Sequence, residues 1–156
     1  MKYHQQVKIK NTDFEIAAET FHDIKLVEFL TYLQPIKIIN WAGIENGKLA
    51  FFKLWFCGWK NFKVKHSNYK RDKNELSFID IGVEMPLGIR YWCHKHIVKK
   101  NKKNIIIIDS LNIEHANLLI GYILFPIFIT PIFIRIILYK RYFKKLIRSR
   151  ISTSLY

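Results

Sequence analysis

The stretch of sequence that decides the fold is YWCHKHIVKKNKKNIIIIDSLNIE, residues 91–114, in which two alternating runs flank a lysine-rich centre. Alternation with a period of two is typical of a strand with one buried face. One face of the first run carries ring and apolar side chains, Trp92, His94, His96 and Val98. The opposite face carries Lys95 and Lys99, and because lysine strongly prefers water, we expect the tryptophan face to point inward. The stretch therefore predicts an antiparallel hairpin with one buried face.

The second run of this hairpin carries a single acid on its inward face. Asp109 lies there among branched aliphatic residues, Ile105, Ile107, Leu111 and Ile113. A turn centred on Asn101-Lys102 places His94 opposite Asp109 and keeps His96 as a diagonal neighbour within side-chain reach. The same register sets Trp92 opposite Leu111. We therefore predict a His–Asp pair at the centre of an apolar, concave face.

Turn signals divide the rest of the chain into short elements. The runs of β-branched and aromatic residues between positions 36 and 114 are broken at Glu45-Asn46-Gly47, Lys60-Asn61, residues 70–74, Pro86-Leu87-Gly88 and residues 99–103. This spacing predicts five or six consecutive antiparallel strands. Residues 2–9 alternate as a further strand. Short helices are expected over residues 14–21 and 25–33, since Asn11-Thr12-Asp13 can cap the first and Pro35 ends the second.

The C-terminal segment predicts one long amphipathic helix. Its apolar residues recur at helical spacing, at Ile132, Ile136, Tyr139, Phe143, Leu146 and Ile147. Its basic residues take the opposite side, at Lys140, Arg141, Lys144, Lys145 and Arg148. A curved antiparallel sheet around this helix is an α+β fold, and a chain of 156 residues suffices for one core of this kind. We therefore expect a single domain over residues 1–148 and a basic, polar tail over residues 149–156.

Residues 118–134, directly upstream, form a 17-residue stretch without a charge, at the lower limit for spanning a bilayer. Pro126 and Pro131 oppose a regular spanning helix, whereas the basic tail is what the positive-inside rule places beside a membrane. Two membrane alternatives therefore stay open. One is an anchor formed by residues 118–134, and the other is peripheral contact of the basic helix with an anionic membrane.

The net charge of +14 raises nucleic acid, an anionic membrane and an acidic ligand as partners. The lysines gather at expected turns and on one helix face, which argues against nucleic acid. Cys57 and Cys93 have no disulfide or metal-site spacing and are expected as buried free thiols. Together with a first segment that lacks an apolar signal region, this favours a cytoplasmic protein.

The His–Asp pair has three interpretations. As a structural feature, it satisfies a carboxylate that would be costly to bury unpaired. In a cavity, a histidine oriented by an aspartate can recognise a ligand or exchange protons near neutral pH. As metal ligands, His94, His96 and Asp109 resemble a facial triad. The sequence offers no fourth protein ligand, so we expect neither a metal nor a cofactor. His66, beside exposed lysines, is expected at the surface.

A set of short motifs is spread over most of the chain, at Phe21-His22-Asp23, Leu33-x-Pro35, Pro86-Leu87-Gly88, Trp92, His94-x-His96, Asp109, Gly121, Phe133-x-Arg135 and Tyr139-x-Arg141. The set resembles small bacterial SRPBCC ligand-binding proteins, in the superfamily of START domains, birch-pollen-type allergens and polyketide cyclases. Ile113 and Ala116 depart from the tyrosine and proline that these relatives tend to have, so the bend between last strand and helix is open. The resemblance implies the helix-grip fold with an apolar cavity, and it leaves the chemistry open because the superfamily holds both carriers and enzymes.

Our first hypothesis is that the chain binds an apolar or amphipathic small molecule, such as a lipid, an isoprenoid or an aromatic compound. The residues expected to contact this ligand are Trp92, His94, His96, Asp109, Leu111, Ile132, Ile136, Tyr139 and Phe143. The alternative is a cyclase or dehydratase-like enzyme in which His94 or His96 acts as general base, oriented by Asp109. The sequence determines neither the ligand nor the oligomeric state.

Overall fold

The computed structural model describes the backbone of residues 1–153 and the side chains of residues 1–150. In chain order the elements are β1 (Lys2–Ile9), α1 (Phe14–Phe21), α2 (Ile24–Thr31), β2 (Ile36–Trp41), β3 (Leu49–Trp55), β4 (Trp59–Arg71), β5 (Glu75–Glu84), β6 (Ile89–Asn101), β7 (Asn104–His115), α3 (Leu118–Phe133) and α4 (Arg135–Thr153). The number and order of these elements confirm the α+β architecture predicted from the sequence.

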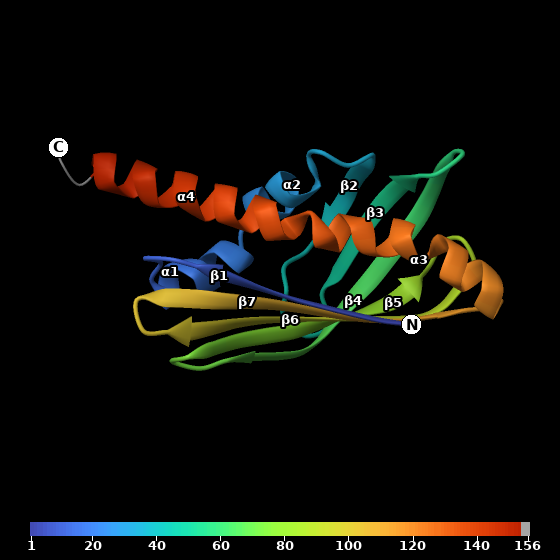
Figure 1. Ribbon diagram of the computed structural model, residues 1–156, viewed down its shortest axis with the longest axis horizontal. Helices are drawn as coiled ribbons and strands as arrows, with labels where there is room; N and C mark the ends of the chain where they lie inside the picture. Colours follow the sequence, from blue (N-terminus) through green and yellow to red (C-terminus); the bar gives the residue numbers. More distant parts are fainter. Residues whose placement is uncertain (154–156) are drawn as a thin grey trace.

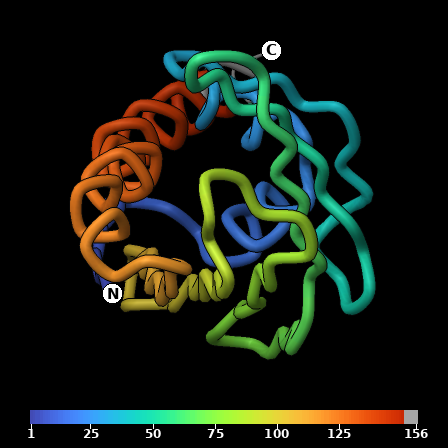
Figure 2. Tube along the Cα trace, turned by 90° about the vertical axis from the view of Figure 1, so that its right-hand side faces the viewer, coloured from blue at the N-terminus to red at the C-terminus, as the bar shows by residue number. Residues whose placement is uncertain are grey.

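The strands form one antiparallel sheet of seven strands in the order β1-β7-β6-β5-β4-β3-β2 (Figure 1). Consecutive strands from β2 to β7 pair with one another, and β1 pairs with β7. Figure 2 shows that the sheet curves strongly and that α3 and α4 lie on its concave side. The sheet therefore grips the C-terminal helices, as expected.

Helices α1 and α3 begin at polar caps. The carboxylate of Asp13 accepts hydrogen bonds from the backbone amides of Glu15 and Ile16 at the start of α1. The side chain of Asn117 accepts a hydrogen bond from the amide of Ile120 at the start of α3. Both caps satisfy amide groups that the first helical turn leaves unpaired.

Gly121 sets how closely α3 approaches the end of β7. A Cβ atom at this position would lie 2.7 Å from the Cβ of His115, which is closer than real Cβ atoms approach. The glycine thus permits a short helix–strand distance, and any larger residue would push α3 away from the sheet.

Two clusters of buried side chains fix the C-terminal helices on the sheet. The cluster under α4 joins the helix to β1, β7 and α1 and includes Val7, Phe14, Phe21, Ile105, Ile107, Leu138, Tyr139 and Phe143. The cluster under α3 includes Trp92, Leu111, Ile113, Phe128 and Ile132. The predicted amphipathic pattern is confirmed, because Ile132, Tyr139 and Phe143 are buried whereas the basic residues Lys140, Arg141, Lys144, Lys145 and Arg148 are exposed.

One predicted turn was wrong. The chain reverses at Phe56–Gly58, where Trp55 pairs with Trp59, and Lys60 and Asn61 lie inside β4. The turn uses the left-handed backbone conformation at Cys57 and Gly58, with φ of 47° and 114°. Cys57 is consequently an exposed thiol and Cys93 a half-buried one, not the buried pair that we expected.

The register of the deciding hairpin also differs from the prediction. Its turn consists of Lys102 and Lys103 alone, with Asn101 paired to Asn104. This shifts the pairing by two residues, so that His96 faces Asp109, His94 faces Leu111 and Trp92 faces Ile113. Since a shift of two residues leaves every side chain on the same face of the sheet, the predicted inward face is unchanged.

The predicted C-terminal helix is divided into two helices. Both prolines lie inside α3, which ends at Phe133, and Ile134 separates it from α4. A break there fits Pro131, which cannot donate the backbone hydrogen bond of a regular helix. Residues 149–153 of the expected tail continue α4, and the last residues, 154–156, lie outside the described part of the chain.

We predict that Phe143→Ala lowers the free energy of unfolding by about 3–5 kcal/mol, because the ring is fully buried under α4 and leaves a cavity. The matched control is Phe133→Ala, since the Phe133 side chain is 55% exposed and its loss should change stability by about 0.5 kcal/mol or less. Urea denaturation of both variants measures the difference. Equal losses would contradict the packing described above.

Candidate functional site

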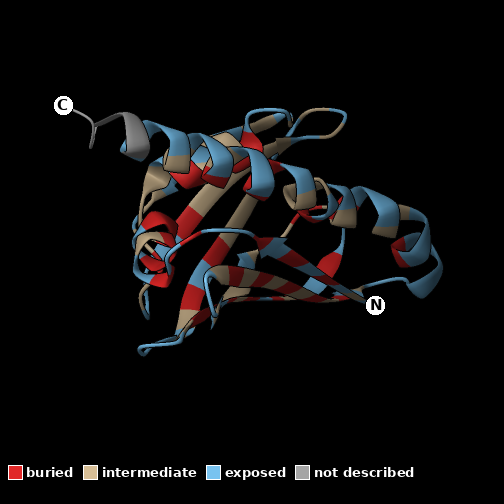
Figure 3. Cartoon of the chain, turned by 60° about the vertical axis from the view of Figure 1, so that its left-hand side comes forward, coloured by how far each residue is buried: buried red, intermediate tan, exposed pale blue. Residues whose placement is uncertain are grey.

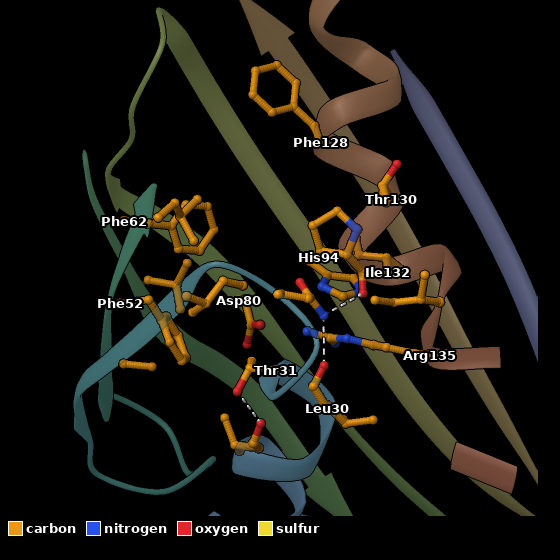
Figure 4. A pocket seen from close by; sticks show the side chains of 18 of the residues that line it. Leu30, Thr31, Phe52, Phe62, Asp80, His94, Phe128, Thr130, Ile132 and Arg135 are labelled. Carbon is orange, nitrogen blue, oxygen red and sulfur yellow. Dashed lines mark hydrogen bonds between the residues drawn. The ribbon is translucent and has the colours of Figure 1, made fainter. Parts of the chain in front are cut away.

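A cavity of about 740 Å³ lies between the sheet and the helices. Its walls come from α2, from the strands β2 to β6, and from α3 and α4 (Figure 4). Most of the lining is apolar and includes Leu30, Ile36, Phe52, Phe62, Phe128 and Ile132. Of the two C-terminal helices, α4 packs directly on β1 and α3 on β7, which leaves a space over the strands from β2 to β6. The position of the cavity thus follows from where the helices touch the sheet.

A group of ionisable side chains forms the polar part of the sheet wall. His66, Asp80, His94 and His96 project from β4, β5 and β6 and all line the cavity. The Asp80 carboxylate accepts a hydrogen bond from His96 Nε2 at 3.0 Å through Oδ2, and its Oδ1 lies 3.1 Å from His66 Nε2. Antiparallel pairing sets Asp80 opposite His94 and His66, so neighbouring strands bring the group together.

Asp109 lies behind this wall, with 1% of its surface exposed. Its Oδ1 is 3.0 Å from His96 Nδ1 and 3.3 Å from His94 Nε2. Its Oδ2 accepts a hydrogen bond of 2.9 Å from Gln5 Nε2, which also donates to the carbonyl of Ile132. The predicted proximity of His94 and Asp109 is thus present, although His96 makes the closer contact.

These contacts determine the charges of the group. Burial alone would raise the pKa of each aspartate. His96 and His66 nevertheless keep the pKa of Asp80 well below its ordinary value. His94 and His96 do the same for the pKa of Asp109. Burial favours the neutral form of His96 as well, but the carboxylates of Asp80 and Asp109 outweigh it and raise its pKa to about 9. Burial and the neighbouring His96 charge lower the pKa of His94 to about 4. At neutral pH, His96 is therefore an imidazolium between two carboxylates, and His94 is neutral.

The helical wall adds a cation and a phenol. Arg135 at the start of α4 and Tyr139 one turn later both line the cavity, and Figure 4 shows the arginine pointing into it. Burial raises the pKa of Tyr139 above its ordinary value. Burial alone would lower the pKa of Arg135, but the effects of Tyr139, Asp109 and Asp80 outweigh it and raise that pKa. Both groups thus keep their protons at neutral pH.

Several buried polar atoms of the cavity wall lack a hydrogen-bond partner among the described residues. Those that make no ion-pair contact either are Gln34 Oε1, His66 Nδ1, Trp92 Nε1, Arg135 Nε and Tyr139 Oη. Because an unsatisfied buried polar group is costly, such atoms call for an explanation. These residues line the cavity from both the sheet and the helical side, which suits a polar partner within the cavity.

The structure separates the residues predicted to contact a ligand into two groups. Trp92, His94, His96, Ile132 and Tyr139 line the cavity. Asp109, Leu111, Ile136 and Phe143 do not appear among the lining residues. Asp109 and Leu111 lie on β7, which the helices cover directly, and Phe143 packs into the core under α4. Ile136 packs, partly buried, against the same core.

Sequence reasoning missed part of the polar group. His66 was expected at the surface, but its side chain is 3% exposed and points into the cavity. The sequence around Asp80, SFIDIGV, lacks alternation, so it gave no signal of which side chains point inward. Arg135 belonged to the resemblance but was assigned to no site, because it precedes a run of exposed basic residues.

Asp80, His94 and His96 also form a candidate metal site, since their ligand atoms lie within 4.8 Å of one another. The donor set fits a cation poorly. Both nitrogens of His96 already face carboxylates, and the positive charge of Arg135 acts on the same group. The arrangement is better suited to holding protons and hydrogen bonds than to holding a metal ion.

No protein family and no curated protein matches the chain in sequence. Solved structures do match it over most of its length. Protein Ms6760 from Mycobacterium smegmatis has a TM-score of 0.65 at 7% identity, over 93% of this chain and 92% of its own. Norcoclaurine synthase from Thalictrum flavum has a TM-score of 0.62 at 15% identity, over 90% and 84%. This chain has the helix-grip fold.

A third helix-grip structure, major latex-like protein 151 from Panax ginseng, has a TM-score of 0.57 at 19% identity, over 88% of this chain and 95% of its own. Another structure of the Thalictrum enzyme, with a TM-score of 0.58 and 15% identity over 81% of this chain and 76% of its own, holds dopamine and hydroxybenzaldehyde. The suspected resemblance to the superfamily of START domains and birch-pollen-type allergens is thus supported at the level of the fold.

We predict that the histidine pair gives the protein a stability maximum near pH 6.5, the ordinary pKa of histidine. Between about pH 4 and 6.5 the folded chain binds fewer protons at His94 than the unfolded chain does, so stability rises with pH. Between pH 6.5 and about 9 it binds more protons at His96, so stability falls with pH. The lowered aspartate pKa values affect only more acidic solutions.

Urea denaturation across this pH range tests the prediction. His96→Gln should remove the alkaline decline, and His94→Gln should flatten the acidic rise. His4→Gln serves as the control, because His4 is exposed. If His96→Gln leaves the alkaline decline unchanged, His96 is not the group responsible.

Proposed function

We propose that the chain, as one domain over residues 1–148, binds an apolar or amphipathic small molecule in the cavity between the sheet and the C-terminal helices. The cavity volume of about 740 Å³ falls within the ordinary range for small-molecule sites. The free thiols Cys57 and Cys93 suit the reducing cytoplasm. The walls supply apolar contact, and the ionisable group supplies a polar end.

The observation that carries this proposal is the set of unpaired buried polar atoms in a cavity whose lining is mostly apolar. A folded chain rarely leaves such atoms unpaired. A ligand with a polar end would satisfy them and would remove apolar surface from water. The small molecules held by a structure of the same fold support this use of the cavity.

The enzyme alternative requires a general base on the cavity wall. His96 does not meet this requirement, because a pKa of about 9 keeps it protonated at neutral pH. His94 is neutral and therefore remains the candidate base, with Asp109 beside it. Asp109→Asn distinguishes the two functions: a carrier should lose about tenfold affinity or less, whereas an enzyme should lose on the order of 10² in turnover.

We predict saturable binding of a fluorescent fatty-acid probe to the wild-type protein, measured by titration. Ala50→Trp should weaken this binding, since Ala50 is buried and lines the cavity, and the larger ring occupies its space. The matched control is Val83→Trp, because Val83 is 59% exposed on β5. Absence of saturable binding to a well-folded wild type would contradict the proposal. Equal effects of Ala50→Trp and Val83→Trp on binding would contradict it as well.

A second surface supports peripheral contact with an anionic membrane. The side chains of Leu118, Leu119 and Ile123 are 69%, 71% and 66% exposed on α3, which carries no charge. The helical span Leu118–Arg150 is long and apolar enough to cross a membrane, and 17% of its most apolar part is buried. Figure 3 shows the exposed residues following one side of both helices. α4 continues this side with exposed lysines and arginines.

We infer that this surface lies on the membrane rather than spanning it, because Gly121, Phe128 and Ile132 hold α3 against the sheet. The apolar side of α3 would enter the interface, and the basic residues of α4 would meet anionic headgroups. The apolar insertion and the charge attraction act together, since neither a short apolar helix nor a basic patch alone binds a membrane firmly.

We predict that the purified protein is soluble without detergent and sediments with vesicles of phosphatidylcholine and phosphatidylglycerol, but weakly with phosphatidylcholine alone. Salt should weaken the binding by screening the basic residues. The double variant Leu119→Glu with Ile123→Glu should abolish it, while Val83→Glu on the sheet should not. If the apolar face instead pairs two copies of the chain, analytical ultracentrifugation will show a dimer and vesicle binding will be absent.

A further inference from the structure

The helical wall of the cavity contains a cation that no protein carboxylate neutralises at close range. Arg135 points into the cavity, and its Nε is buried without a hydrogen-bond partner (Figure 4). Among the residues with described side chains, no carboxylate oxygen lies within 4.0 Å of its guanidinium nitrogens. Asp80 and Asp109 contact histidines instead. The arginine is therefore available to an anion inside the cavity.

Tyr139 places a second donor beside this cation. It follows Arg135 by four residues on α4, so both side chains lie on the same helix face. The phenol is fully buried, lines the cavity and has no hydrogen-bond partner among the described residues. Since burial raises its pKa, the O–H remains protonated and can donate.

The chemistry of this pair favours a carboxylate. A guanidinium presents parallel N–H donors that match the two oxygens of a carboxylate. One arginine balances one negative charge, which is the charge of a carboxylate, whereas a phosphate monoester carries about 1.5 to 2. Asp80 and Asp109 would repel the additional charge, because both are ionised close to the cavity. A carboxylate thus satisfies the donors at a lower electrostatic cost than a phosphate does.

We propose that the cavity binds apolar carboxylic acids, with Arg135 and Tyr139 holding the carboxylate and the apolar walls enclosing the chain or ring. This ligand class rests on the cavity-binding function proposed above and makes it specific. Lys60 and Arg141 also line the cavity, but both are exposed. They offer a different anion site, which the experiment separates from Arg135.

The test is displacement of the neutral fluorescent probe N-phenyl-1-naphthylamine by three compounds with the same chain, dodecanoic acid, 1-dodecanol and dodecyl phosphate. The wild type should bind dodecanoate most tightly. Arg135→Gln should weaken dodecanoate binding roughly 10- to 100-fold, the range for a charge-assisted hydrogen bond. Binding of 1-dodecanol and of the probe should stay unchanged. Arg141→Gln, which removes the other arginine of the cavity lining, should weaken dodecanoate binding much less than Arg135→Gln does.

Tyr139→Phe provides a second variant that keeps the buried ring. It should weaken dodecanoate binding about three- to tenfold, without an effect on 1-dodecanol. Equal wild-type affinity for acid and alcohol, tighter binding of dodecyl phosphate, or an Arg141→Gln loss as large as that of Arg135→Gln would each overturn the carboxylate site while leaving cavity binding in place. If the wild type binds neither the probe nor any of the three compounds, cavity binding itself fails.

Discussion

The rest of the structure depends on one buried carboxylate, that of Asp109. It lies on β7 and contacts Gln5 of β1 and the two histidines of β6, and Gln5 in turn donates to the carbonyl of Ile132 in α3. Three strands and a helix thus meet around one charge. Since an ionised group at this depth is tolerated only when its oxygens are satisfied, these elements have to stay in register. Asp109 determines the positions of the histidines without touching the cavity.

The helices divide the concave side of the sheet into a packed half and a hollow half. α4 contacts β1 and α3 contacts β7 directly, and buried side chains such as Val7, Ile107 and Ile113 pack there. The strands from β2 to β6 face the cavity, where polar atoms remain unpaired. The direct contacts of α3 and α4 and the cavity lining therefore lie over different strands. This separation lets the cavity wall carry unsatisfied groups that a packed core would not tolerate.

The sequence predicted the parts of this arrangement that depend on periodicity. Alternation identified the inward face of residues 91–98, and this result survived a two-residue error in register because strand faces repeat every two residues. The register itself depends on the turn, and a run of lysines and asparagines does not reveal which two residues form it. Asp80 was missed because both faces of β5 carry apolar residues near it, so no alternation shows which side chains point inward. Arg135 was missed because a charged residue in an amphipathic helix is usually exposed to solvent. The sequence does not show that the curved sheet leaves a cavity beside this face of the helix.

The pairing of the first strand with the last determines when the protein can fold during synthesis. Gln5 and Asp109 are separated by 104 residues, and β1 has no partner until β7 leaves the ribosome. At about 5–20 residues per second, β1 waits roughly 5–20 s. During this interval the other hairpins can form, since each pairs with its chain neighbour. β7 also carries Asp109, so the nascent chain does not bury this charge before Gln5 and the two histidines have been synthesised.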